Sequence, residues 1–215
     1  MTKTGKRFVT AVGFLAAFAV WTLLVRFVDV QAIGPEGSSV GLAGINQWVH
    51  SMTGIHFPLY HITDWLGLVP IGVCMGFGFL GLVQWIKRKS IRKVDRSILL
   101  LGGYYLVVMA AYVFFEVFAV NYRPVLIEGI LEVSYPSSTT MLVLCVMPTA
   151  LMQLNQRVKN GILRQCISAA IITFILFMVI GRLVSGVHWV SDIIGGALLS
   201  AGLVTLYDAA CSLSK

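Results

Sequence analysis

The segment IITFILFMVIGRLVSGVHWVSDIIGGALLSAGLVTLY, residues 171–207, places an arginine, a histidine and an aspartate within eleven positions of an otherwise apolar sequence. These residues are Arg182, His188 and Asp192, in the pattern Arg-x5-His-x3-Asp. Charged groups at membrane depth are costly, and they usually face one another or a polar cavity. The segment therefore predicts two membrane helices with a functional site between them.

Ser185 and Gly186 mark the expected junction of these two helices. In one continuous helix, Arg182 and His188 would be six residues apart, about 9 Å in rise and on different faces. We therefore expect one helix to end at this pair and the next to begin near His188. His188 and Asp192 then lie four residues apart on one face, where the carboxylate can orient the imidazole.

The composition of the chain indicates an integral membrane protein. Of its 215 residues, 58% are hydrophobic and 12% are charged, and a soluble domain carries about twice that charged fraction. Several apolar runs approach the roughly 20 residues that a membrane helix needs. We predict an all-α, polytopic protein with a single domain over residues 1–215 and six transmembrane helices, at residues 8–28, 66–86, 98–120, 138–154, 166–184 and 191–210.

The basic residues predict the orientation of these helices. Thirteen of the 16 lysines and arginines lie on one side, and the positive-inside rule places that side and both termini in the cytoplasm. The net charge of +7 is thus a topology signal, and we expect no nucleic-acid partner. We expect a protein of a bacterial plasma membrane with its site facing the non-cytoplasmic side. The thirteen are Lys3, Lys6, Arg7, Lys87, Arg88, Lys89, Arg92, Lys93, Arg96, Arg157, Lys159, Arg164 and Lys215.

Residues 29–65 form the longest segment outside the predicted spans. Their Gly, Ser and Pro content, with Trp48 and Trp65, suits an interfacial segment on the outer surface. A short amphipathic helix is expected near residues 41–52. The segment either caps the site and gates lipid entry, or is an ordinary outer loop with aromatic anchors.

Two further polar elements lie on the same predicted side as the Arg-His-Asp cluster. Residues 116–124, EVFAVNYRP, place Arg123 where Pro124 makes the helix give way to a loop. Residues 134–140, SYPSSTT, put hydroxyl residues after Pro136, a helix-start pattern whose free backbone N–H groups can hold an anion.

Together these elements predict a phosphate site with a histidine nucleophile. Two arginines supply forked donors for phosphate oxygens. With one imidazole nitrogen held by Asp192, the other nitrogen of His188 is free to attack phosphorus. The chemistry requires no cofactor and no metal, and no cluster of His, Cys or carboxylate residues has convincing ligand spacing.

The three elements resemble the signatures of the type 2 phosphatidic acid phosphatase superfamily, membrane lipid phosphatases related to vanadium haloperoxidases. The family motifs Lys-x6-Arg-Pro, Pro-Ser-Gly-His and Ser-Arg-x5-His-x3-Asp correspond to residues 116–124, 136–139 and 181–192. The third motif is specific, and the first two are partial matches. The resemblance covers the predicted spans three to six.

The resemblance implies a role for each matching residue. His188 would form a phosphohistidine, with Asp192 orienting its ring. Glu116 and Pro136 would line the site. The groups that bind phosphate would be Arg123, Arg182, Ser137 and the backbone around Ser138.

The sequence departs from the family at four positions. Thr139 occupies the place of the histidine that protonates the leaving group, and loss of a general acid costs about 10²–10⁴ in rate. Glu116 replaces the family lysine, Ser138 replaces glycine, and Gly181 replaces serine. Thr139 leaves four alternatives: a slow phosphatase, a pseudoenzyme, an enzyme that uses water or another donor, or a form altered at this position.

Two classes of function stay open from the sequence. The first is a hydrolase of lipid phosphates or diphosphates, of the phosphatidate, phosphatidylglycerophosphate or polyprenyl diphosphate type. The second is an inactive lipid-phosphate binder or scaffold, for which Thr139 and Glu116 are the evidence. A transporter is disfavoured, because the unusual charges gather near one membrane face and not at the midplane.

Overall fold

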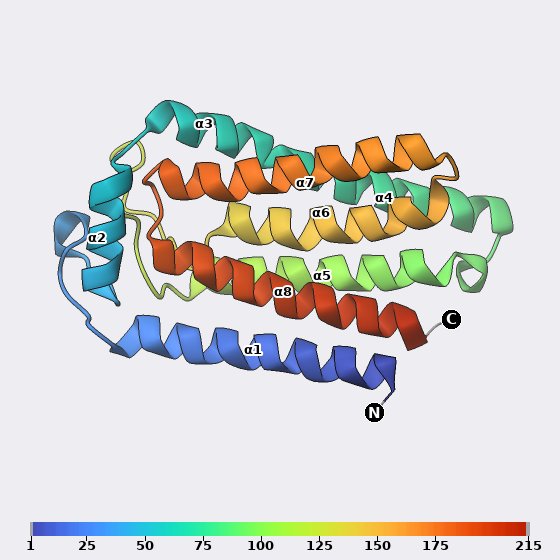
Figure 1. The fold of residues 1–215 in the computed structure, drawn as a ribbon, viewed down its shortest axis with the longest axis horizontal. Coiled ribbons are helices and arrows are strands. Elements are labelled where there is room, and N and C mark those ends of the chain that lie inside the picture. Colours follow the sequence, from blue (N-terminus) through green and yellow to red (C-terminus); the bar gives the residue numbers. More distant parts are fainter. Residues whose placement is uncertain (1, 214–215) are drawn as a thin grey trace.

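The computed structural model describes residues 2–213, which form a bundle of long helices running side by side (Figure 1). Within that range six helical stretches are long and apolar enough to cross a membrane, so the prediction of an all-α, six-span protein is confirmed. The spanning elements are α1 (Lys3–Phe27), α3 (Phe57–Leu66) continued by α4 (Leu68–Arg88), α5 (Arg96–Val117), α6 (Ser138–Arg157), α7 (Gly161–Val184) and α8 (Val190–Leu213).

The centre of the bundle is formed by α6 and α8. In each of these two helices at least half of the most apolar 18-residue stretch is buried inside the protein, whereas less than a quarter of the corresponding stretch is buried in the other four spans. Met141, Cys145 and Leu203 belong to the largest buried apolar cluster. Large apolar side chains elsewhere point outward, among them Phe79 and Leu106, as lipid-facing side chains do.

The outer segment between the first two spans differs from its prediction in one respect. It contains a 3₁₀ turn (Pro35–Gly37) and α2 (Ala43–Thr53), which lies across the end of the bundle (Figure 1), close to the helix expected near residues 41–52. Residues 57–65 were expected to lie outside the spans, and this boundary is wrong because they belong to α3. Gly67 keeps helical backbone angles and joins α3 to α4.

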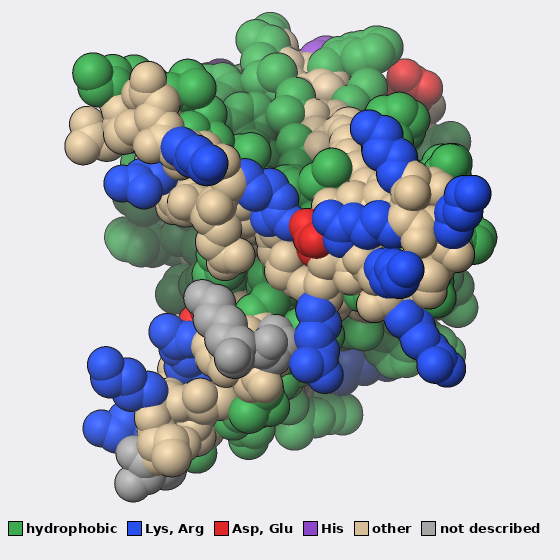
Figure 2. Space-filling view, turned by 90° about the vertical axis from the view of Figure 1, so that its right-hand side faces the viewer, with side chains coloured by type: hydrophobic (Ala, Val, Ile, Leu, Met, Phe, Trp, Pro, Cys, Tyr) green, Lys and Arg blue, Asp and Glu red, His purple; other side chains and the backbone are tan. Residues whose placement is uncertain are grey.

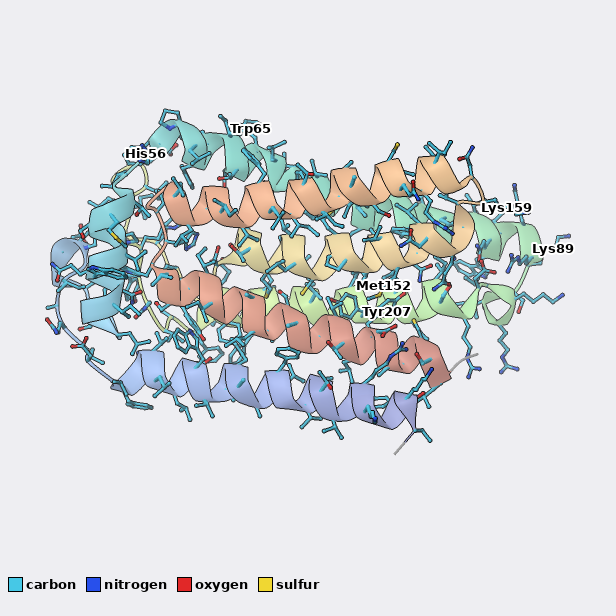
Figure 3. All side chains as sticks on the ribbon, viewed as in Figure 1. His56, Trp65, Lys89, Met152, Lys159 and Tyr207 are labelled. Atoms are coloured by element: carbon cyan, nitrogen blue, oxygen red, sulfur yellow. The ribbon has the colours of Figure 1, made fainter. Side chains whose placement is uncertain are left out.

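The two ends of the bundle differ in charge. Both termini lie at one end (Figure 1), and Figure 2 shows lysines and arginines gathered on that end. Lys89 and Lys159 lie there, with the 3₁₀ turn Ile91–Lys93, whereas His56 lies at the opposite end (Figure 3). This asymmetry agrees with the distribution that led us to expect cytoplasmic termini.

The junction of α7 and α8 is a tight turn at the end opposite the termini. The last α7 residue is Val184, and Gly186 adopts φ +69°, a conformation that favours glycine. A Cβ at Gly186 would also overlap the carbonyl oxygen of Gly54. The predicted break at Ser185 and Gly186 is therefore confirmed, and His188 lies in the turn just before α8 begins.

Candidate active site

A polar cavity of about 550 Å³ lies where the three predicted elements meet. It is bounded by the loop after α5, the first turn of α6 and the end of α7. Of the residues predicted from the sequence, it is lined by Glu116, Arg123, Ser138, Thr139 and Arg182. Its walls also include Tyr60, Asp64, Tyr112 and Glu132, which the sequence patterns did not indicate.

His188 is buried beside this cavity and contacts its wall through Arg123. Its Nε2 lies 3.4 Å from Nη1 of Arg123. Its Nδ1 lies 3.6 Å from Oδ2 of Asp192. That second distance exceeds a hydrogen bond, although catalytic contacts often shorten only when substrate binds.

The surroundings of His188 favour its neutral form. Burial, followed by the positive charges of Arg123 and Arg182, holds the pKa of His188 well below its usual range. The backbone carbonyl of Ser134 offsets this effect only in part. A neutral imidazole keeps a lone pair for nucleophilic attack.

Asp192 is fully buried and has several oriented donors. Its Oδ2 accepts a hydrogen bond from the backbone N–H of Trp189 at 3.0 Å, and its Oδ1 lies 3.4 Å from the hydroxyl of Ser191. Its backbone carbonyl accepts from the N–H of Ser137 at 3.1 Å. The start of α8 is thereby tied to the start of α6.

Arg182 is almost completely buried, with a relative exposure of 1%. Its Nη2 lies 3.4 Å from Oδ1 of Asp64, and its Nη1 lies 3.4 Å from the hydroxyl of Thr63. The ring of Tyr60 packs against the guanidinium at 5.0 Å. The three partners belong to α3, so this unpredicted helix orients the arginine.

Arg123 pairs with Glu132, which the sequence did not single out. Nε of Arg123 lies 2.9 Å from Oε2 of Glu132, and its backbone N–H donates to the Glu132 carbonyl at 3.0 Å. An antiparallel bridge between Tyr122 and Val133 places the two residues opposite each other. Chain reversal between α5 and α6 thus gives Arg123 the carboxylate of Glu132 as its partner.

The predicted hydroxyl residues at the start of α6 have two different roles: one caps the helix and two line the cavity. The side chain of Ser137 is fully buried and caps the helix, accepting from the N–H of Thr140 at 3.5 Å. Ser138 and Thr139 line the cavity. Pro136 lines a small neighbouring pocket together with Glu116 and Ser138. Backbone N–H groups at this helix start remain the expected anion contacts.

The other three histidines do not line the cavity. Nε2 of His50 lies 3.0 Å from the carbonyl oxygen of Gly186, and Nε2 of His56 lies 2.9 Å from that of Thr53. The ring of His61 packs beside that of Tyr60. No histidine of the chain therefore occupies the position that a histidine at residue 139 would have.

Comparisons with known proteins agree with this fold. The model of the PAP2 superfamily matches residues 49–209. A solved structure is similar over 96% of this chain and 98% of that chain, with 19% identity and a TM-score of 0.57. It is the first transmembrane PAP2 type phosphatidylglycerolphosphate phosphatase from Bacillus subtilis. A search of curated proteins gave no match. From the family match over most of its length, the chain belongs to the PAP2 superfamily of membrane lipid phosphatases.

Proposed function

We propose that the chain is a membrane phosphatase that removes phosphate from a lipid phosphate or diphosphate through a phosphohistidine on His188. The observation that carries the proposal is the position of Nε2 of His188, 3.4 Å from a buried arginine. A second buried arginine, Arg182, lines the same cavity. A neutral nucleophile beside two cations suits attack on an anionic phosphorus centre.

A lipid substrate is supported by apolar grooves that adjoin the cavity. One of about 390 Å³ lies between α4 and α5 and shares Tyr112 with the polar cavity. Another of about 330 Å³ shares Cys74 and Tyr105 with the first. The hydrocarbon tail of a lipid can lie along these two grooves while its phosphate group lies beside Arg123 and Arg182. The name of the Bacillus subtilis protein makes phosphatidylglycerophosphate one substrate to test.

The reaction we propose has two displacements. Arg123, Arg182 and the backbone of Ser138 hold the phosphate while Nε2 of His188 attacks phosphorus and the bond to the lipid oxygen breaks. Asp192 stabilises the positive charge that develops on the imidazole. Water then attacks phosphorus and the bond to Nε2 breaks, which releases inorganic phosphate and returns His188 to its neutral form. The proton lost by this water balances the proton taken up by the leaving oxygen in the first displacement.

Thr139 determines the expected speed of the first displacement. The leaving oxygen needs a proton, and a threonine hydroxyl is not an acid near neutral pH. We propose that water supplies this proton, so that turnover is slow. Replacing Thr139 with histidine should then raise the rate by about 10²–10⁴, which is the usual contribution of a general acid.

Phosphate release from short-chain phosphatidate and phosphatidylglycerophosphate tests the proposal. We expect slow release by the unmodified chain and faster release by Thr139→His. Adding His188→Ala to either form should reduce phosphate release to the level of an assay without enzyme. Rapid release by the unmodified chain that Thr139→His does not improve would show that residue 139 is not the missing acid. Release that survives His188→Ala would disprove the histidine mechanism.

A lipid-phosphate binder without turnover is the second candidate, favoured by Thr139 and by the carboxylate of Glu116 at the cavity wall. For this function, vesicles containing phosphatidate should bind the unmodified chain, while neither it nor Thr139→His releases phosphate. Binding should weaken in Arg182→Ala, because that change removes a buried cation from the cavity.

A further inference from the structure

The outer helix α2 is fixed to the start of α8 by the side chain of Asn46, which is fully buried. Its Nδ2 donates to the carbonyl of Gly41 at 2.8 Å and to the hydroxyl of Ser191 at 2.9 Å. Its Oδ1 accepts from the backbone N–H of Ser191 at 3.1 Å. The first N–H groups of a helix have no partner within the helix, so Asn46 satisfies one of those at the start of α8.

The hydroxyl of Ser191 extends this contact to Asp192. Because the oxygen of Ser191 accepts from Asn46, its single proton is free to point elsewhere. Oδ1 of Asp192 lies 3.4 Å away and is the acceptor in that direction. The other carboxylate oxygen faces Nδ1 of His188 at 3.6 Å. A polar chain therefore runs from Asn46 through Ser191 and Asp192 to His188.

A second residue of α2, His50, contacts the backbone before His188 and the side chain after it. His50 lies one helical turn after Asn46, and its Nε2 is 3.0 Å from the carbonyl oxygen of Gly186. Its ring also packs against that of Trp189, with 5.4 Å between centroids. The same face of α2 thus holds the turn before and after His188.

We propose that Asn46 is a positioning residue, which sets the orientation of Asp192 through Ser191 and thereby holds the ring of His188 for attack. The proposal rests on the proposed function of His188 as the nucleophile. Asn46 precedes residue 49, where the match to the family model begins. None of the three motifs includes Asn46, and its positioning role is inferred only from the contacts that α2 makes.

Kinetics in the Thr139→His background, using short-chain phosphatidate, test the effect on the reaction. We expect Asn46→Ala to lower kcat on the order of 10- to 100-fold, because small displacements of reacting groups have such effects. KM should stay unchanged, since the phosphate contacts are intact. Ser191→Ala should act similarly, and the double variant should be no slower than the slower single variant, because both break one chain.

The matched control is Thr149→Val, which removes a buried hydroxyl from α6 outside the cavity. It separates general loss of packing from misplacement of His188. If Asn46→Ala and Thr149→Val change kcat equally, the positioning role is disproved. If Asn46→Ala does not fold, Ser191→Ala decides the same point, since it removes only one hydroxyl.

Nitrogen-15 NMR of histidine-labelled full-length chain gives a readout that does not need turnover. The His188 signals are identified by their loss in His188→Ala. In the unmodified chain we expect one neutral tautomer, and in Asn46→Ala averaged signals from both. Unchanged His188 signals in Asn46→Ala would overturn the proposal. Phosphate release that survives His188→Ala would instead disprove the proposed function, while the NMR comparison still decides whether Asn46 orients the ring.

Discussion

At the scale of single residues, the state of His188 is determined by its neighbours more than by its own chemistry. It is buried and faces Arg123, and Arg182 lies in the same cavity wall. Both the loss of hydration and the two positive charges disfavour the protonated ring. Its nearest carboxylate, on Asp192, lies 3.6 Å away, beyond hydrogen-bonding distance. The nucleophile is therefore available without prior deprotonation.

This arrangement predicts how His188 responds to pH. Free histidine titrates near pH 6.5, and a pKa below that value means that the neutral ring persists as the pH falls through 6.5. Nitrogen-15 chemical shifts should show His188 unprotonated at pH 6. Removing one nearby charge with Arg123→Gln should move its titration to higher pH. Protonation of His188 near pH 6.5 in the unmodified chain would contradict this prediction.

At the scale of elements, the turn between α7 and α8 was predictable, and the helix α3 that orients Arg182 was not. Ser185 and Gly186 interrupt two apolar runs, which is a local signal. By contrast, residues 57–65 belong to the segment whose Gly, Ser and Pro content predicts an interfacial location, although they form part of a helix that orients Arg182. Glu132 and Asn46 reach the site through chain reversal and long-range contact, which no local spacing reveals.

The same turn predicts the effect of a single added methyl group. Gly186→Ala places a Cβ against the Gly54 carbonyl in a left-handed conformation, and such strain costs about 1–3 kcal/mol. We expect a lower melting temperature in detergent and slower phosphate release, since His188 lies two residues away. Gly103→Ala is the control, because its Cβ meets no atom within 4 Å. Equal stability of the two variants would refute the strain argument.

At the scale of the whole molecule, the basic surface and the polar cavity lie toward opposite ends of the bundle. The basic residues gather at the end that holds both termini (Figure 2), and the cavity lies toward the other end, lined by the loop after α5, the first turn of α6 and the end of α7. Because basic loops stay in the cytoplasm, this separation predicts that the substrate phosphate is cleaved at the outer leaflet. The distribution of lysines and arginines along the sequence sufficed for this prediction, whereas the cavity and its lining residues could be found only from the fold.

Cysteine labelling measures this orientation directly. Lys159→Cys and His56→Cys introduce exposed thiols at opposite ends of the bundle (Figure 3). A membrane-impermeant maleimide should label His56→Cys in right-side-out vesicles and Lys159→Cys only in inverted ones. The unmodified chain, with its four native cysteines, gives the background. Labelling in the opposite sense would place the cavity at the cytoplasmic leaflet, and the lipid phosphates available to Arg123 and Arg182 would then be those of the inner leaflet.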